Sequence, residues 1–140
     1  MTETVPIVGA VLRNGQGQYL LVQERKPHIY GLWNWPAGHV DAGETDSDAA
    51  VREVKEETNL DVRIVDLEPV YEAPGDVGTN HWVRLFVGEV IGGVLQFQRE
   101  ELLDARWFGR DEIATLDNNG QTRGGQVMGA ITTLENRLAA

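Results

Sequence analysis

Three glutamates spaced like side chains on one face of a helix are the residues best suited to chemistry. Glu53, Glu56 and Glu57 occupy positions i, i+3 and i+4, which gathers three carboxylates on one side of an α-helix. Like charges at this spacing repel one another, and a hard divalent cation such as Mg²⁺ or Mn²⁺ offsets the repulsion because carboxylate oxygens are its preferred ligands. The spacing indicates a metal site for phosphate chemistry, with a solvated acidic face as the alternative.

The segment around these glutamates predicts the helix that must position them. We expect a helix over residues 46–58, which contain no Gly or Pro, with Thr45, Asp46 or Ser47 as its cap. At roughly 100° per residue, the carboxylates occupy an arc of about 100°. The apolar residues cluster on another face: Ala50, Val51 and Val54. The helix therefore has one side that packs and one side that binds.

The order of residues from Gly38 to Leu60 adds a pattern to the glutamates. It runs Gly, five residues, Glu44, seven residues, then Arg-Glu-Val-Lys-Glu-Glu-Thr-Asn-Leu. This order closely resembles the Nudix box, Gly-x5-Glu-x7-Arg-Glu-U-x-Glu-Glu-x-Gly-U, where U is a bulky aliphatic residue. Eight of its nine fixed positions match, and the exception is Asn59 in place of Gly. That position follows a helix and needs a left-handed backbone, for which Asn is the usual second choice, so we expect the geometry to be retained.

The resemblance to Nudix hydrolases, the MutT-like family, extends beyond the box. Residues 31–39 read Gly-Leu-Trp-Asn-Trp-Pro-Ala-Gly-His and look like the family's lead-in. The Pro-Ala-Gly-His variant is that of a branch that includes phosphatases of nucleoside and thiamine-precursor diphosphates. Residues 106–108 and 111–113 look like the family's later strand and helix start. The resemblance implies an α/β fold, an α/β/α sandwich with a mixed β-sheet and a loop-helix-loop box.

Residue by residue, the resemblance also implies a site. Glu53, Glu56 and Glu57 would bind Mg²⁺, or Mn²⁺, with the Gly38 carbonyl as a further ligand. Arg52 and Glu44 would form an orienting pair, a role that suits arginine because it donates two parallel hydrogen bonds to a carboxylate. The reaction implied is hydrolysis of a diphosphate bond in a small nucleotide or related organic pyrophosphate, by in-line attack of a metal-activated water.

The sequence is less informative about the general base, which accepts the proton of the attacking water, and about the residues that contact the substrate. Glu56 can accept the proton of the attacking water, and so can a later carboxylate, Glu101 or Asp104, which could equally belong to an ordinary acidic loop. Aromatic and basic side chains could contact the substrate, although tryptophans in a small domain more often belong to the core. The predicted substrate contacts are Arg25, Tyr30, Trp33 and Arg84.

Hydrophobic patterns predict the remaining elements. Residues 7–12 and 19–23 read as two strands of an opening hairpin, and residues 27–38 as an aromatic-rich loop. The other predicted strands are residues 62–67, 69–72, 82–91 and 94–98. Four apolar residues at helical spacing predict a second helix near the carboxyl terminus: Val127, Ile131, Leu134 and Leu138. Strands mixed with two helices indicate an α/β domain.

Composition limits the function classes. The 140 residues fit one domain, residues 1–140, and the absence of cysteine excludes disulfides and a cysteine nucleophile. A net charge of −10 argues against nucleic-acid binding, and no apolar run predicts a signal peptide or membrane span. We therefore expect a cytoplasmic protein with a small-molecule substrate, and residues 27–35 could support a homodimer.

Two further classes share the family's fold. A noncatalytic Nudix-like module that senses a nucleotide usually loses box carboxylates, whereas Glu53, Glu56 and Glu57 all remain here. An enzyme like isopentenyl diphosphate isomerase uses a cysteine, and this chain has none. The hydrolase is the leading hypothesis, and the sensing module is the alternative.

Overall fold

Two β-sheets and three α-helices make up the computed structural model, which describes residues 3–140. The elements follow in chain order: β1 (Val5–Leu12), β2 (Tyr19–Glu24), the 3₁₀ helix η1 (Pro27–Ile29), β3 (Trp33–Asn34), β4 (Ala37–His39), α1 (Asp46–Thr58), β5 (Asp61–Ile64), β6 (Tyr71–Pro74), β7 (His81–Gly92), β8 (Leu102–Phe108), α2 (Arg110–Asn118) and α3 (Gly125–Ala139).

The larger sheet is mixed and has five strands. Its order is β4-β1-β7-β5, and β6 also pairs with β7. β1 runs parallel to β7, with Val8 opposite Arg84, whereas the other pairs are antiparallel. The smaller sheet, β3-β2-β8, is antiparallel throughout. The ends of β2 and β4 thus belong to different sheets.

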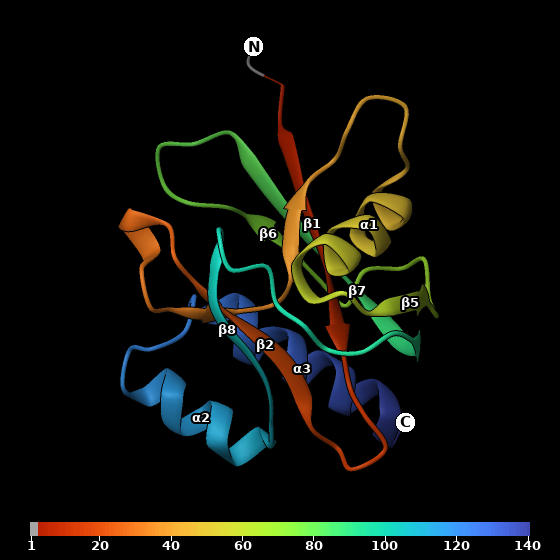
Figure 1. Ribbon diagram of the computed structural model, residues 1–140, viewed down its shortest axis with the longest axis vertical. Coiled ribbons are helices and arrows are strands. Elements are labelled where there is room, and N and C mark those ends of the chain that lie inside the picture. Colours follow the sequence, from red (N-terminus) through yellow and green to blue (C-terminus); the bar gives the residue numbers. More distant parts are fainter. Residues whose placement is uncertain (1–2) are drawn as a thin grey trace.

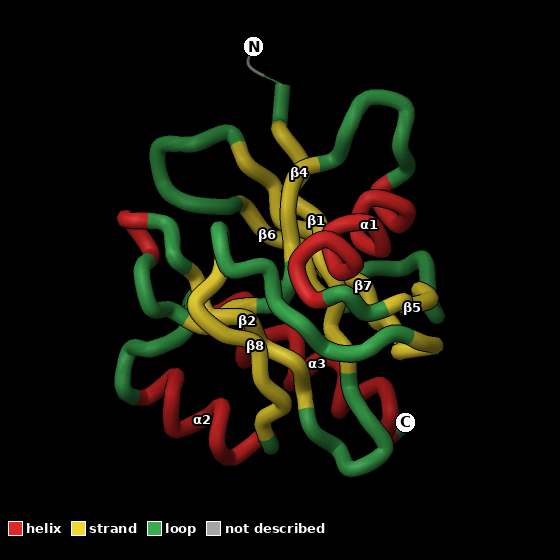
Figure 2. Tube along the Cα trace, in the orientation of Figure 1, coloured by secondary structure: helices red, strands yellow, loops and turns green. Residues whose placement is uncertain are grey.

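Helices cover both faces of the larger sheet (Figures 1 and 2). Alternate residues of β1 point to opposite sides, as in any strand. Val8 packs with Ala50 of α1, while Val11 belongs to the core cluster that includes Ile131 of α3. Burial of apolar side chains on both faces fixes the layers, and the predicted α/β sandwich with a mixed sheet is confirmed.

α1 begins and ends where the sequence predicts. Thr45 is the N-cap, and its hydroxyl accepts a hydrogen bond of 3.1 Å from the Asp48 backbone N–H. Asn59 ends the helix with φ of 65°, in the left-handed region, and its backbone N–H bonds to the Lys55 carbonyl. The substitution of Asn for Gly in the box pattern therefore leaves the backbone geometry intact.

The predicted opening hairpin is wrong. β1 and β2 enter different sheets, and between them only Arg13 and Tyr19 form an isolated bridge. The turn itself exists, because the Asn14 N–H bonds to the Gln18 carbonyl at 2.9 Å. Beyond that turn, each strand finds longer partners elsewhere, β7 for β1 and β8 for β2.

Other predicted elements also differ from the structure. Residues 94–98 form no strand and instead run extended beside the end of α1, where the Gln96 and Gln98 N–H groups bond to the Thr58 and Glu57 carbonyls. The predicted loop at residues 27–38 contains η1, β3 and the start of β4. A third helix, α2, follows β8, as the family resemblance at residues 111–113 implied.

Within residues 3–140, no helix has both the length and the apolar character needed to cross a lipid bilayer.

Candidate metal and diphosphate site

The apolar face of α1 determines where its carboxylates point. Ala49 and Ala50 pack on Val8, and Val54 packs with Leu20. With this face held against the sheet, the acidic face turns toward the ends of β2 and β4. It meets a cavity of about 160 Å³ there, whose lining gathers Glu24, Lys26, Ala37, Gly38, His39, Glu53, Glu56, Glu57 and Glu101.

Two backbone features of β4 hold the carboxylates close to the strand. The Ala37 N–H donates a hydrogen bond of 2.8 Å to Oε1 of Glu57. At the next residue, a Cβ on Gly38 would lie 2.2 Å from Cδ of Glu53, so a side chain there would occupy the place of that carboxyl group. The box glycine is needed because only a bare backbone leaves room for Glu53.

Arg52 ties the loop before α1 to the acidic face. Its Nε and Nη2 donate to the two carboxylate oxygens of Glu44 at 2.8 and 2.9 Å. Its Nη1 donates to Glu53 and Glu56 at 3.0 and 3.1 Å, and Nη2 also reaches the His39 carbonyl at 2.8 Å. The structure thus brings Arg52 and Glu44 together in the two-bond geometry expected of an orienting pair.

We expect Arg52→Lys to lower kcat/KM about 10- to 100-fold while the protein still folds. A lysine ammonium cannot reproduce the planar set of bonds to Glu44, Glu53 and His39, so the loop and the helix face lose their common anchor. Steady-state kinetics would measure the loss, with the exposed Arg63→Lys as the matched control. Activity of Arg52→Lys within twofold of wild type would remove Arg52 from the positioning role.

The cavity gathers five glutamates, Glu24, Glu53, Glu56, Glu57 and Glu101, and one lysine, Lys26, so its lining carries more acidic than basic side chains. Burial is the largest cause that raises the pKa of Glu57 well above its ordinary value; the Ala37 N–H opposes it, and the charges of Glu24, Glu53 and Glu101 add to it. Burial also raises the pKa of Glu53, against the hydrogen bond from Arg52. Within residues 3–140, Glu57 has no ion pair although it is only 5% exposed.

These carboxylates fit a hard divalent cation. They supply oxygen ligands only, and a bound cation would favour the ionised form of Glu57, which burial disfavours. In the described part of the chain, no three acidic or histidine side chains form a ready-made metal cluster. Arg52 Nη1 lies against both Glu53 and Glu56, so the side chains must adjust when a cation binds.

The two later carboxylates predicted as bases separate in the structure. Glu101 lines the cavity beside the box glutamates. Asp104 lies outside it on β8, where Oδ2 accepts a hydrogen bond of 2.6 Å from Arg106 and Oδ1 accepts one of 2.8 Å from the Ala105 N–H. The structure therefore brings Glu101, and not Asp104, to the site.

The structure places all four predicted substrate contacts outside this cavity. Trp33 is only 7% exposed and packs edge-on against Phe108 in the core, with ring centroids 4.8 Å apart, so it offers no ring face for stacking. Tyr30 is 60% exposed after η1. Arg25 lines a neighbouring groove with Glu100 and Glu101.

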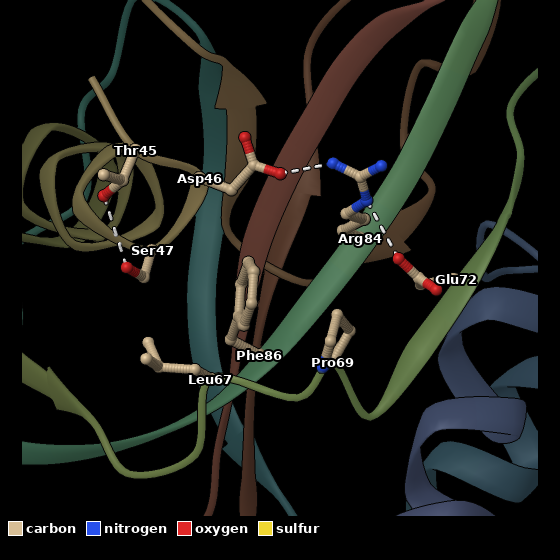
Figure 3. A pocket seen from close by; sticks show the side chains of 8 residues that line it. All are labelled: Thr45, Asp46, Ser47, Leu67, Pro69, Glu72, Arg84 and Phe86. Atoms are coloured by element: carbon tan, nitrogen blue, oxygen red, sulfur yellow. Dashed lines mark hydrogen bonds and ion pairs between the residues drawn. The ribbon is translucent and has the colours of Figure 1, made fainter. Parts of the chain in front are cut away.

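Arg84 lies in a different pocket, of about 400 Å³, near the start of α1 (Figure 3). Its guanidinium points between Asp46 and Glu72 and donates to both carboxylates. The hydrogen bond from Arg84 to Asp46 is the largest cause that raises the arginine's pKa. Nε and Nη1 of Arg84 thus link β7 to β6 and to α1, at a distance from the carboxylate cavity.

Sequence reasoning missed a second cavity that adjoins the first. It has a volume of about 260 Å³ and shares Glu24, Lys26 and the backbone of β4 with the carboxylate cavity. Its other lining residues come from six separate segments: Ile7, His28, Ile29, Asn34, Asp76, His81 and Arg123. No local spacing relates these residues, so only the fold reveals them.

Comparisons with known proteins agree with this geometry. Among curated relatives, the 8-oxo-dGDP phosphatase NUDT18 of Danio rerio is 39% identical over 108 residues, covering 74% of this chain and 32% of that protein. An ADP-ribose pyrophosphatase of Methanocaldococcus jannaschii is 33% identical over 98 residues, covering 69% of this chain and 57% of that one. The chain spans about a third of the length of the first curated relatives that it matches.

Solved structures share the whole arrangement. A NUDIX hydrolase from Nitrosomonas europaea superposes with a TM-score of 0.82 at 28% identity, over 96% of this chain and 90% of that one. An Ap4A hydrolase of C. elegans has the same fold, with a TM-score of 0.78 at 22% identity, over 97% and 98% of the two chains. The family model for the NUDIX domain matches residues 3–128. Since that match covers most of the sequence, the chain belongs to the NUDIX domain family.

Proposed function

We propose that this chain hydrolyses a diphosphate bond in a small nucleotide or a related organic pyrophosphate, with Mg²⁺ or Mn²⁺ as its cofactor. The observation that carries the proposal is the buried carboxyl group of Glu57, which has no ion pair within residues 3–140, at the wall of a cavity whose other carboxylates come from α1 itself, from β2 and from the segment before β8. Such a set of oxygen ligands suits cations that bridge to phosphate oxygens. The named activities of the relatives support the same chemistry.

In this proposal, different residues bind the cation, orient its ligands and accept the proton of the attacking water. Glu53, Glu56 and Glu57 hold the cation, with the Gly38 carbonyl as an additional ligand, and Arg52 fixes their orientation through Glu44. A bound divalent cation supplies charge neutralisation at the phosphates and a lower pKa for a bound water. Glu101 is better placed than Asp104 to accept the water's proton, because it lines the cavity; Glu56 is the other candidate.

The adjoining cavity supports binding of the rest of the substrate. It opens onto the same stretch of β4, so a diphosphate at the glutamates would direct its attached group toward the adjoining space. Arg123 lines that space, and its Nε is the buried side-chain nitrogen within residues 3–140 that has no hydrogen-bond partner. A donor left in this state is costly unless a ligand accepts from it. Lys26, shared by both cavities, adds a cation for the phosphates.

The activity is tested by incubating the protein with Mg²⁺ and a panel of diphosphate compounds. The panel contains 8-oxo-dGDP, ADP-ribose, Ap4A, nucleoside triphosphates, nucleotide sugars and thiamine-precursor pyrophosphates. Phosphate and pyrophosphate release would be measured, and products formed in ¹⁸O-labelled water identified by mass spectrometry. We expect turnover of at least one compound, with label in one phosphate product. Calorimetric binding of these compounds without any turnover would favour the nucleotide-sensing module instead.

The cellular context belongs to the same proposal. A cytoplasmic location matches a soluble nucleotide as substrate, and fractionation of cells would test it. A homodimer through residues 27–35 would cover Tyr30, which is 60% exposed. Light scattering of wild type and Tyr30→Asp would test that interface, and a monomer at all concentrations would exclude it.

A further inference from the structure

The adjoining cavity differs from the carboxylate cavity in its charge. Its lining carries two acidic side chains, Glu24 and Asp76, and two basic ones, Lys26 and Arg123, so the formal charges cancel when the histidines are counted as neutral. The carboxylate cavity gathers five glutamates and one lysine. A cation at the glutamates would attract a diphosphate, whereas the balanced adjoining space offers no excess positive charge for a further phosphate. The adjoining space therefore suits an uncharged part of a substrate.

Arg123 brings an unused donor to the wall of this adjoining cavity. Its Nε is buried and has no hydrogen-bond partner within residues 3–140. Its Nη2 donates to both carboxylate oxygens of Asp76, at 3.3 and 3.2 Å. Asp76 thus holds the guanidinium at one corner and leaves the Nε–H unengaged. A buried donor without an acceptor is unfavourable, so folding alone does not account for this arrangement.

The rest of the wall combines apolar side chains with a second donor. Ile7 and Ile29 line the cavity together with Asn34. The Oδ1 atom of Asn34 accepts a hydrogen bond of 2.7 Å from Nε2 of Gln126, which leaves the NH2 group of the same amide as a donor. A flat heterocycle has apolar faces and hydrogen-bond acceptors on its edge, whereas a sugar has hydroxyls on several sides that each need a partner. Apolar walls with a few placed donors therefore suit the heterocycle better.

We propose that the adjoining cavity binds an uncharged nitrogen heterocycle attached to the diphosphate, and that Arg123 determines which heterocycle is accepted. The Nε–H donates to a carbonyl oxygen or a ring nitrogen on the edge of the heterocycle, once the guanidinium turns about its contact with Asp76 to uncover Nε. Asp76 is a positioning residue that acts through Arg123. The inference rests on the proposed function for the place of the diphosphate, and it adds the chemistry of the attached group.

The alternative role for Arg123 is purely structural. Through Asp76 it fastens the loop between β6 and β7 to the turn before α3. If this were its only role, its loss would lower the melting temperature and weaken every ligand alike. In the proposed role the melting temperature stays near that of wild type, because a partly exposed ion pair contributes little and a buried Nε without a partner contributes nothing. Only ligands that carry the heterocycle then lose affinity.

Calorimetry with ligands that contain no diphosphate bond tests the proposal without turnover. The probes, in Mg²⁺, are AMP, GMP, CMP, UMP and the monophosphate of the thiamine-precursor pyrimidine, and the reference is ribose 5-phosphate, which has no nitrogen heterocycle. Wild type should bind at least one probe about ten or more times more tightly than the reference. Arg123→Met should weaken that probe about tenfold or more, as loss of a hydrogen bond from a charged donor does, and change the reference less than about twofold.

Arg63→Met is the matched control for Arg123→Met. Arg63 is exposed and, like Arg123, is paired with a carboxylate, that of Glu89, so its loss should leave the affinity for every probe unchanged. Asp76→Asn should weaken the best probe by about three- to tenfold. The double variant of Arg123→Met and Asp76→Asn should bind that probe no more weakly than Arg123→Met alone, because Asp76 acts only through Arg123.

Three results would each overturn the proposal. They are binding of ribose 5-phosphate to wild type as tightly as the best probe, unchanged affinity for the best probe in Arg123→Met, and an equal loss for all ligands in Arg123→Met with a lower melting temperature. Selective binding that depends on Arg123 in a protein that hydrolyses nothing would refute the proposed activity and leave the heterocycle site standing.

Discussion

Glu57→Gln will reduce kcat by about a thousandfold or more on any substrate that wild type hydrolyses. The amide keeps an oxygen to accept the 2.8 Å hydrogen bond from the Ala37 N–H, so the local backbone has no reason to move. What it loses is the negative charge. A cation contributes several kcal/mol of charge stabilisation to a phosphoryl transition state, and each 1.36 kcal/mol corresponds to a factor of about ten in rate.

Two measurements separate this effect from unfolding. The melting temperature of metal-free Glu57→Gln should equal or exceed that of wild type, because a neutral amide is easier to bury than a carboxylate. The exposed Glu68→Gln controls for the loss of one negative charge and should keep full activity. If Glu57→Gln retained more than a tenth of wild-type kcat, the assignment of Glu57 to the metal would be wrong.

Gly38→Ala will lower kcat/KM by about a hundredfold with little loss of stability. Its Cβ would lie 2.2 Å from Cδ and 2.3 Å from Oε2 of Glu53. Those atoms are the free end of a flexible side chain, so the carboxyl group moves aside rather than the strand. Displacement of a reacting or binding group by about 1 Å can cost a hundredfold in rate.

The control for this substitution is Gly15→Ala. Gly15 lies in the turn after β1, where a Cβ would meet no atom within 4 Å, so activity and melting temperature should stay unchanged. Gly38→Ala should also bind Mn²⁺ more weakly than wild type, since Glu53 can no longer occupy its place beside β4. Wild-type activity and Mn²⁺ affinity in Gly38→Ala would show that the position of Glu53 is not critical.

Local sequence was enough to predict α1 and its carboxylates. The cap at Thr45, the left-handed Asn59 and the apolar face with Val54 are all encoded within one segment. The pairing of Arg52 with Glu44, eight residues apart, was instead implied by the resemblance to the Nudix box. Local spacing therefore describes the helix and its carboxylate face, and the resemblance adds the partner of Arg52.

Features that depend on distant pairing could not be predicted this way. The turn at residues 14–17 looks like that of a hairpin, yet β1 pairs in parallel with β7, seventy or more residues later. Glu24 and Arg123 carry no motif, and their meeting at one cavity depends on the packing of both sheets. Trp33 and Arg84 had suitable chemistry for substrate contacts, but the core and two carboxylates already engage them.

The extended segment beside the end of α1 constrains how this site can vary. Its Gln96 and Gln98 N–H groups hold the Thr58 and Glu57 carbonyls at 3.0 Å, and the chain reaches Glu101 three residues later. Because these bonds use the backbone, the exposed side chains of Val94 and Gln96 are nearly free to change, whereas Leu95 and Phe97 pack against the core and the Gln98 side chain accepts a hydrogen bond from the Glu101 N–H. The number of residues in this segment is constrained, since one insertion between Gln98 and Glu101 would move the Glu101 carboxylate out of register with α1. Variation in this region of the family should therefore appear as substitution and not as a change in length.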